Sequence, residues 1–182
     1  MAAFLIISSC NKHKHSTILD FDQKQKEGIC RRFSTNSPVI MTDEMKILLV
    51  DDDIDDRLIF ADLLSAGHPN ARLTLAENGL EMVNLLDETT TADLPDIIIL
   101  DQNMPRMTGK ESLIFLKENP RYHRIPTFIY STYQVGEFYH ECFDLGAVDV
   151  VAKPDTIQGY REMIGRFLFN SAHAHADNIQ PR

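Results

Sequence analysis

The feature that most constrains the fold is a strict alternation of short apolar segments and helical patterns that begins at Met45. Each of five apolar segments is followed by a stretch whose apolar residues recur at helical spacing. The third segment, Asp96–Leu100, has no polar side, which predicts a strand covered on both faces. Alternation of this kind implies right-handed crossovers and a parallel sheet. We therefore predict an α/β fold with a doubly wound, five-stranded parallel sheet. Its strands are expected at Lys46–Val50, Arg72–Ala76, Asp96–Leu100, Pro126–Tyr130 and Val148–Ala152.

The sequence divides into three parts. Residues 1–40 are largely polar and show no sustained periodicity, which predicts a disordered or non-native N-terminal extension. Its first eleven residues faintly resemble an export leader ending at Cys10, but they lack the basic segment that such leaders carry. Residues 41–170 hold the globular pattern, and residues 171–182 read as a polar tail.

Composition bears on partners and compartment. The net charge of −9 argues against nucleic acid as the main partner, because binding a phosphate backbone needs a basic face. The longest unbroken apolar run, Met1–Ile7, is far shorter than the about 20 residues that a membrane-spanning helix needs, so no membrane association is expected. Three cysteines without metal-ligand spacing favour the reducing cytoplasm.

Chemically active residue types stand where four of the predicted strands end. In open parallel sheets, ligands bind beyond the carboxyl ends of the strands, so these residues are expected to converge. Crowded carboxylates are unfavourable without a cation, and oxygen ligands of this kind suit Mg²⁺. A lysine supplies counter-charge for a phosphoryl group, and a hydroxyl supplies a hydrogen bond. The pattern indicates a phosphoryl site with a carboxylate nucleophile. Its members are Asp51 and Asp52 after the first strand, Asp101 after the third, Ser131 and Thr132 after the fourth, and Lys153 after the fifth.

An aspartate-nucleophile phosphatase is the enzymatic alternative. Haloacid-dehalogenase-like enzymes place a second Asp two residues after the nucleophile, as general acid and base. Here that position holds Asn103, which cannot transfer protons at neutral pH. A phosphoaspartate at Asp101 is therefore expected to persist, which suits a switch better than a catalytic intermediate.

Four sequence blocks together resemble the receiver domain of two-component response regulators. They are Ile-Leu-Leu-Val-Asp51-Asp52, Leu-Asp101-Gln-Asn-Met-Pro105-Arg-Met-Thr-Gly109, Ser131-Thr132 and Lys153-Pro154. The resemblance covers about Met45–Asn170 and implies a flavodoxin-like strand order of 2-1-3-4-5. The blocks are similar to those of small stand-alone regulators that serve phytochrome-type and other histidine kinases.

The resemblance implies a role for each matching residue. Asp101 would be the phosphoacceptor, and Asp52, Asp101 and the Asn103 backbone carbonyl would bind Mg²⁺ directly, with Asp51 acting through a water. Ser131 would be the switch hydroxyl with Thr132 beside it, and Lys153 would pair with the phosphoryl group through a loop with a cis Lys153–Pro154 bond.

One position departs from the family pattern. Many receivers carry an aromatic residue three positions before the lysine, and here that position holds Val150. A rotating ring is therefore not expected to be part of the switch in this chain. A switch through Ser131 alone would shift the loops after the third and fourth strands and a helix expected from about Gln134 to Leu145.

The function implied is that of a single-domain response regulator. A histidine kinase or histidine phosphotransfer protein would supply the phosphoryl group, and output would pass through protein contact, as a relay or by homodimerisation. No turnover on an external substrate is expected. A binding-only pseudo-receiver and, less favoured, a small phosphatase are the alternatives.

Overall fold

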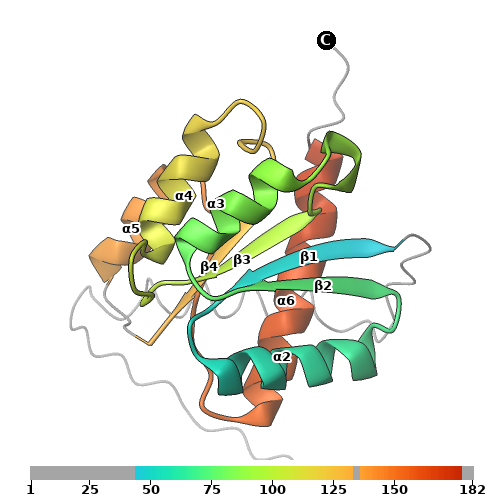
Figure 1. The fold of residues 1–182 in the computed structure, drawn as a ribbon. Helices are drawn as coiled ribbons and strands as arrows, with labels where there is room; N and C mark the ends of the chain where they lie inside the picture. The colour runs from blue at the N-terminus through green and yellow to red at the C-terminus, as the bar shows by residue number, and fades with distance from the viewer. Residues whose placement is uncertain (1–43, 133–135, 178–182) are drawn as a thin grey trace, which may run out of the picture. The chain divides into compact units, whose positions relative to one another are not determined.

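The computed structural model describes residues 44–132 and 136–177 (Figure 1). The predicted extension over residues 1–40 and the last five residues of the predicted tail lie outside this part of the chain. In the described ranges, no helix is long and apolar enough to cross a lipid bilayer.

The described part folds as five parallel strands in the order β2-β1-β3-β4-β5, which confirms the predicted sheet. A helix follows each strand (Figure 1). A short 3-10 turn, η1, precedes β3. In chain order the elements are β1 (Met45–Val50), α2 (Ile54–Gly67), β2 (Ala71–Ala76), α3 (Gly79–Glu88), η1 (Thr91–Asp93), β3 (Ile97–Asp101), α4 (Gly109–Glu118), β4 (Thr127–Ser131), α5 (Gly136–Asp144), β5 (Asp149–Ala152) and α6 (Ile157–Asp177).

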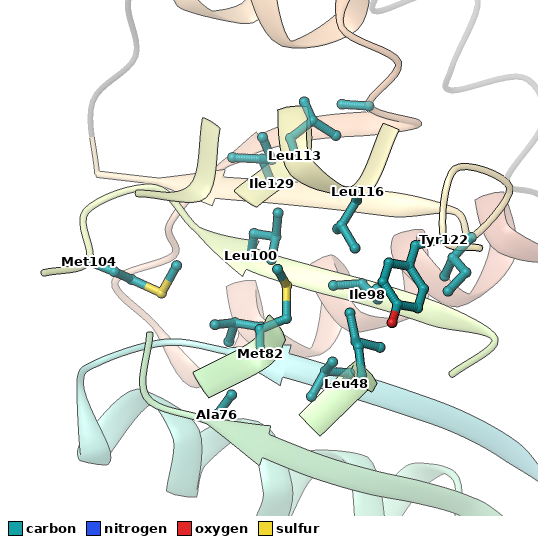
Figure 2. Close-up of a cluster of buried hydrophobic side chains, with 14 of the residues drawn as sticks. Leu48, Ala76, Met82, Ile98, Leu100, Met104, Leu113, Leu116, Tyr122 and Ile129 are labelled. Atoms are coloured by element: carbon teal, nitrogen blue, oxygen red, sulfur yellow. The ribbon is translucent and has the colours of Figure 1, made fainter. Parts of the chain in front are cut away.

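Two hydrophobic clusters cover the two faces of the sheet. In β3, Ile98 and Leu100 pack toward α3, α4 and α5, whereas Ile97 and Ile99 pack toward α2 and α6. Figure 2 shows the first cluster, with Leu100 lying among side chains of α3 and α4. All five residues of β3 are buried, as expected for the central strand of a doubly wound sheet. The central strand therefore packs against helices on both faces, up to the buried Asp101 at its C-terminal end.

Two sequence expectations are wrong. The helix α6 does not end near residue 170 but runs to Asp177, and Ser171 is fully buried, with its hydroxyl donating to the Leu168 carbonyl. The start of the predicted polar tail is thus helical. The Lys153–Pro154 bond is trans, as are all other peptide bonds in the described residues. Trans is the lower-energy isomer of an X–Pro bond by about 0.5–1 kcal/mol.

Candidate functional site

The carboxyl ends of β1, β3, β4 and β5 meet at one edge of the sheet. Asp101 is the last residue of β3, and Ser131 is the last residue of β4. Asp51 directly follows β1, and Lys153 directly follows β5. Hydrogen bonding of Lys153 N–H to the Ser131 carbonyl (2.8 Å) continues the β4–β5 pairing to this edge. Parallel pairing in register is therefore what brings together residues that lie up to 102 positions apart.

Three carboxylates form a compact cluster at this edge. One oxygen from each of Asp51, Asp52 and Asp101 lies within 4.8 Å of the others. Asp51 and Asp101 are buried, and Asp52 is exposed. The buried Asp101 Oδ1 accepts no hydrogen bond from the described residues, and the Lys153 ammonium lies 3.7 Å away. An orphaned buried oxygen beside two further carboxylates is a donor set that fits a hard divalent cation such as Mg²⁺.

The loop after β3 fixes the Asp101 carboxylate. The Asn103 backbone N–H donates to Asp101 Oδ2 at 2.8 Å. The loop can pass this close because position 109 is glycine: a Cβ on Gly109 would stand 2.4 Å from the Asp101 carbonyl oxygen. Thr108 then starts α4 with a capping box to Glu111. The Gly109 position in the sequence block is thus a packing requirement at the site.

Asp51 is held on all sides by the fold. Its Oδ1 accepts from the Asp53 N–H at 2.8 Å, and its Oδ2 accepts from the Tyr130 hydroxyl and lies 3.2 Å from Lys153 Nζ. The Asp51 backbone carbonyl accepts from the buried Arg57 guanidinium at 2.5 Å. Burial raises the pKa of the Asp51 carboxyl, and these hydrogen bonds and the Lys153 charge offset part of that rise.

Lys153 is the cation of the site and is shared by three carboxylates. Its ammonium lies 2.5 Å from Asp56, 3.2 Å from Asp51 and 3.7 Å from Asp101, and 5.2 Å from the centre of the Tyr130 ring. Burial lowers the pKa of Lys153, but the hydrogen bond to Asp56 and the charges of Asp101 and Asp51 outweigh it, so the net pKa is raised. The side chain therefore stays charged at neutral pH.

The two hydroxyl residues differ in their surroundings. Ser131 is buried at the end of β4, whereas Thr132 is exposed and its hydroxyl accepts from the Asn103 side-chain amide at 2.9 Å. This contact ties the loop after β3 to the loop after β4. All seven predicted site residues thus lie at the same edge of the sheet, and their chemical roles stay predictions.

Sequence reasoning missed three residues of this site: Asp56, Tyr130 and Tyr160. Asp56 pairs with Lys153, and the Tyr160 hydroxyl donates to the other Asp56 oxygen at 2.5 Å. Tyr130 pairs in register with Asp101, so strand alternation could have placed it near the cluster. Asp53, by contrast, is the N-cap of α2, and its side chain accepts from the Asp55 N–H.

The crowding at Asp101 leads to a stability prediction. Burial first, and then the charges of Asp51 and Asp52, raise the pKa of Asp101 to about 6, although Lys153 and the Asn103 N–H act in the opposite direction. The folded state thus disfavours the ionised carboxyl, and the chain loses stability as pH rises from about 4 through 6. Asp101→Asn removes that cost and is expected to stabilise the metal-free protein by roughly 1–3 kcal/mol at pH 7.5.

Urea unfolding of both proteins from pH 4 to 8, with a chelator present, measures this difference. The gain should shrink as pH falls below about 6, because the wild-type carboxyl is then protonated as well. A stability gain that is the same at pH 4 and pH 8 would contradict the assignment of the cost to the Asp101 charge.

Comparison with known proteins agrees with this geometry. The family model for the response regulator receiver domain matches residues 47–164, well over half of the chain. The chain is 32% identical over 125 residues to the two-component response regulator ARR3 of Arabidopsis thaliana, covering 65% of this chain but only 53% of that protein. It is 33% identical over 108 residues to ORR13 of Oryza sativa subsp. japonica, covering 59% of this chain and 85% of that one.

Solved structures give the same result. The phosphorylated cyanobacterial phytochrome response regulator RcpA is 25% identical with a TM-score of 0.62, over 69% of this chain and 94% of its own. The chemotaxis response regulator CheY4 of Vibrio cholerae is 26% identical with a TM-score of 0.58, over 68% of this chain and 98% of its own. The family match, the 2-1-3-4-5 sheet and the acidic cluster at its carboxyl edge lead to one conclusion: this chain belongs to the response regulator receiver domain family.

Proposed function

We propose that this protein accepts a phosphoryl group on Asp101 from the phosphohistidine of a histidine kinase or a histidine phosphotransfer protein. The observation that carries the proposal is the Asp101 carboxylate itself. It is buried at the end of the central strand, has one oxygen without a hydrogen bond from the described residues, and lies between an acidic pair and a lysine. The similarity to RcpA, which was solved in a phosphorylated form, supports it.

The chain's own residues supply position and charge for this transfer. Asp101 is mostly ionised at neutral pH, since its pKa is about 6, and its carboxylate oxygen forms a bond to phosphorus. The P–N bond of the donor breaks, and the imidazole leaves with the electron pair and takes a proton from solvent. Lys153 offsets the charge of the transferred group, and the hydroxyl of Ser131, the last residue of β4, donates a hydrogen bond to it.

The residues fit a divalent cation, and Mg²⁺ is the one we propose. Asp52, Asp101 and the backbone carbonyl of Asn103 would hold it directly, and Asp51 through a water. A bound ion would supply positive charge that offsets the negative charge of a phosphoryl group at Asp101.

Signalling rather than turnover is the proposed outcome. Asn103 stands two residues after Asp101 and donates its amide to Thr132, so it offers no proton-transfer group for rapid hydrolysis. We propose that the signal then leaves the domain by contact with a partner protein or by homodimerisation, in the cytoplasm. The chain spans about half of the length of ARR3.

A phosphodonor assay separates this function from its alternatives. Incubation with acetyl phosphate and Mg²⁺ is expected to give about one long-lived acyl phosphate per chain. Phosphate-affinity electrophoresis measures the fraction of the protein that carries it. No label at all would favour a binding-only pseudo-receiver. Label that turns over rapidly, with continuous phosphate release from acetyl phosphate, would favour a phosphatase.

The switch is predicted to run through Ser131 without an aromatic ring on β5. Val150 is buried in the cluster under α4 and α5, and its β-branched side chain has little χ1 freedom. Beryllofluoride, a phosphoryl mimic, is expected to change amide hydrogen exchange in the loops after β3 and β4 and in α5. Changes centred on β5 and α6, with the loop after Ser131 silent, would contradict this prediction.

A further inference from the structure

The closest partner of Lys153 is a carboxylate that the transfer reaction does not use. Asp56 Oδ2 lies 2.5 Å from Lys153 Nζ, closer than Asp51 at 3.2 Å or Asp101 at 3.7 Å. Asp56 comes from the first turn of α2, on the helix side of the site, and is not one of the three carboxylates that cluster within 4.8 Å. The Lys153 ammonium therefore lies nearer to Asp56, which takes no part in the proposed transfer, than to Asp101, the proposed phosphoacceptor.

Asp56 is itself fixed in place. Its Oδ1 accepts from the hydroxyl of Tyr160, a buried residue in the first turn of α6, at 2.5 Å. Both carboxylate oxygens of Asp56 thus have a partner: the Tyr160 hydroxyl of α6 for Oδ1 and the Lys153 ammonium for Oδ2. The side chains of Asp56 and Lys153 are only 18% and 12% exposed, so solvent screens their attraction less than that of a surface pair.

Asp56 therefore competes with Asp51 and Asp101 for the ammonium group of Lys153. An ammonium that Asp56 holds at 2.5 Å pairs less closely with Asp51 and Asp101, at 3.2 and 3.7 Å, and so repels a cation at these two carboxylates less. The same pairing opposes the movement of Lys153 to a phosphoryl group on Asp101, because the contact with Asp56 must weaken first. Holding Lys153 at Asp56 should therefore favour metal binding and disfavour the phosphorylated state.

We propose that Asp56, oriented by Tyr160, is a positioning residue that draws the Lys153 ammonium toward α2, weakens its pairing with Asp51 and Asp101, and releases it when the phosphoryl group arrives. This inference rests on the proposed function for its second half only. The first half concerns the metal-free and metal-bound protein and does not depend on phosphorylation. Two binding measurements with opposite expected signs test the two halves separately.

The variant Asp56→Asn keeps an acceptor for Tyr160 and removes the charge that holds Lys153. Its affinity for Mg²⁺ is expected to fall about fivefold in titration calorimetry, because Lys153 then pairs more closely with Asp51 and Asp101 than it does in the wild type. At saturating Mg²⁺, its affinity for beryllofluoride is expected to rise about fivefold. Tyr160→Phe should shift both affinities in the same directions by a smaller factor. A merely structural defect would lower both affinities together.

Two controls decide whether Asp56 acts through Lys153. Asp55→Asn makes the same charge change on the preceding, exposed residue of α2 and should leave both affinities within about twofold. In a Lys153→Met background, Asp56→Asn should change Mg²⁺ affinity by less than about twofold, because the ammonium group through which Asp56 acts is absent.

Three results would overturn the proposal. One is an undiminished effect of Asp56→Asn in the Lys153→Met background, which would show direct action of the Asp56 charge on the ion. Another is an equal effect of Asp55→Asn, and the third is a wild-type protein that binds no Mg²⁺. A wild type that binds Mg²⁺ but neither beryllofluoride nor a phosphoryl group would instead refute the proposed function. The Mg²⁺ titrations of Asp56→Asn, with and without Lys153→Met, would still decide the role of Asp56.

Discussion

Replacing Asp101 by Asn is expected to abolish stable labelling by acetyl phosphate, which is the largest effect predicted for this protein. The amide keeps the size of the carboxylate but lacks the anionic oxygen that forms the bond to phosphorus. Other carboxylates lie nearby, yet Asp51 has both oxygens occupied by Asp53, Tyr130 and Lys153. Mass spectrometry after reduction of the acyl phosphate should place the modification of the wild type on the peptide that contains Asp101.

The matched control is Asp96→Asn. Asp96 lies at the opposite end of β3, where its carboxylate accepts from the Lys46 N–H at 2.7 Å. This variant should label as the wild type does, because the carboxyl edge of the sheet is unchanged. Label mapped to Asp51 or Asp52, or undiminished labelling of Asp101→Asn, would refute the assignment of the phosphoacceptor.

The sequence predicted the sheet and the residues at its carboxyl edge because both depend on short-range patterns. An unbroken apolar run such as Ile97–Leu100 can be buried only if both faces are covered, so β3 had to be central. Once the strands are parallel, their carboxyl ends share an edge, and Asp101, Ser131 and Lys153 must meet there. The shared edge therefore follows from local sequence patterns, whereas the strand order 2-1-3-4-5 was implied by the resemblance to receiver domains.

The contacts that sequence reasoning missed depend on side-chain direction between distant elements. The pairing of Asp56 with Lys153 and Tyr160 spans about 100 positions and needs the packing of α2 against α6. The length of α6 was missed for a different reason. Polarity made the segment after Asn170 look like a tail, whereas its alanines favour a helix that continues from the packed part of α6.

The second large effect expected is on metal binding: Asp52→Ala should weaken Mg²⁺ affinity by roughly 10- to 100-fold. Asp52 is the exposed member of the carboxylate cluster, and the proposed site holds only one other direct carboxylate ligand, Asp101. Without the Asp52 carboxylate, the ion would be bound by water at that position, and Asp101 would be its one direct carboxylate ligand. The effect should be visible in calorimetric titration with Mg²⁺ or Mn²⁺ at pH 7.5, where the Asp101 carboxyl, with its pKa of about 6, is ionised.

The adjacent residue provides the matched comparison for this prediction. Asp53→Ala removes an equal charge but takes away the N-cap of α2, since the Asp53 side chain accepts from the Asp55 N–H. Its main effect should be a loss of about 1 kcal/mol in the free energy of unfolding, with Mg²⁺ affinity within a few-fold of the wild type. Because Asp52 and Asp53 differ by one position, the pair tests the register of the site directly. A larger loss of metal affinity in Asp53→Ala than in Asp52→Ala would show that the ligand assignment is off by one residue.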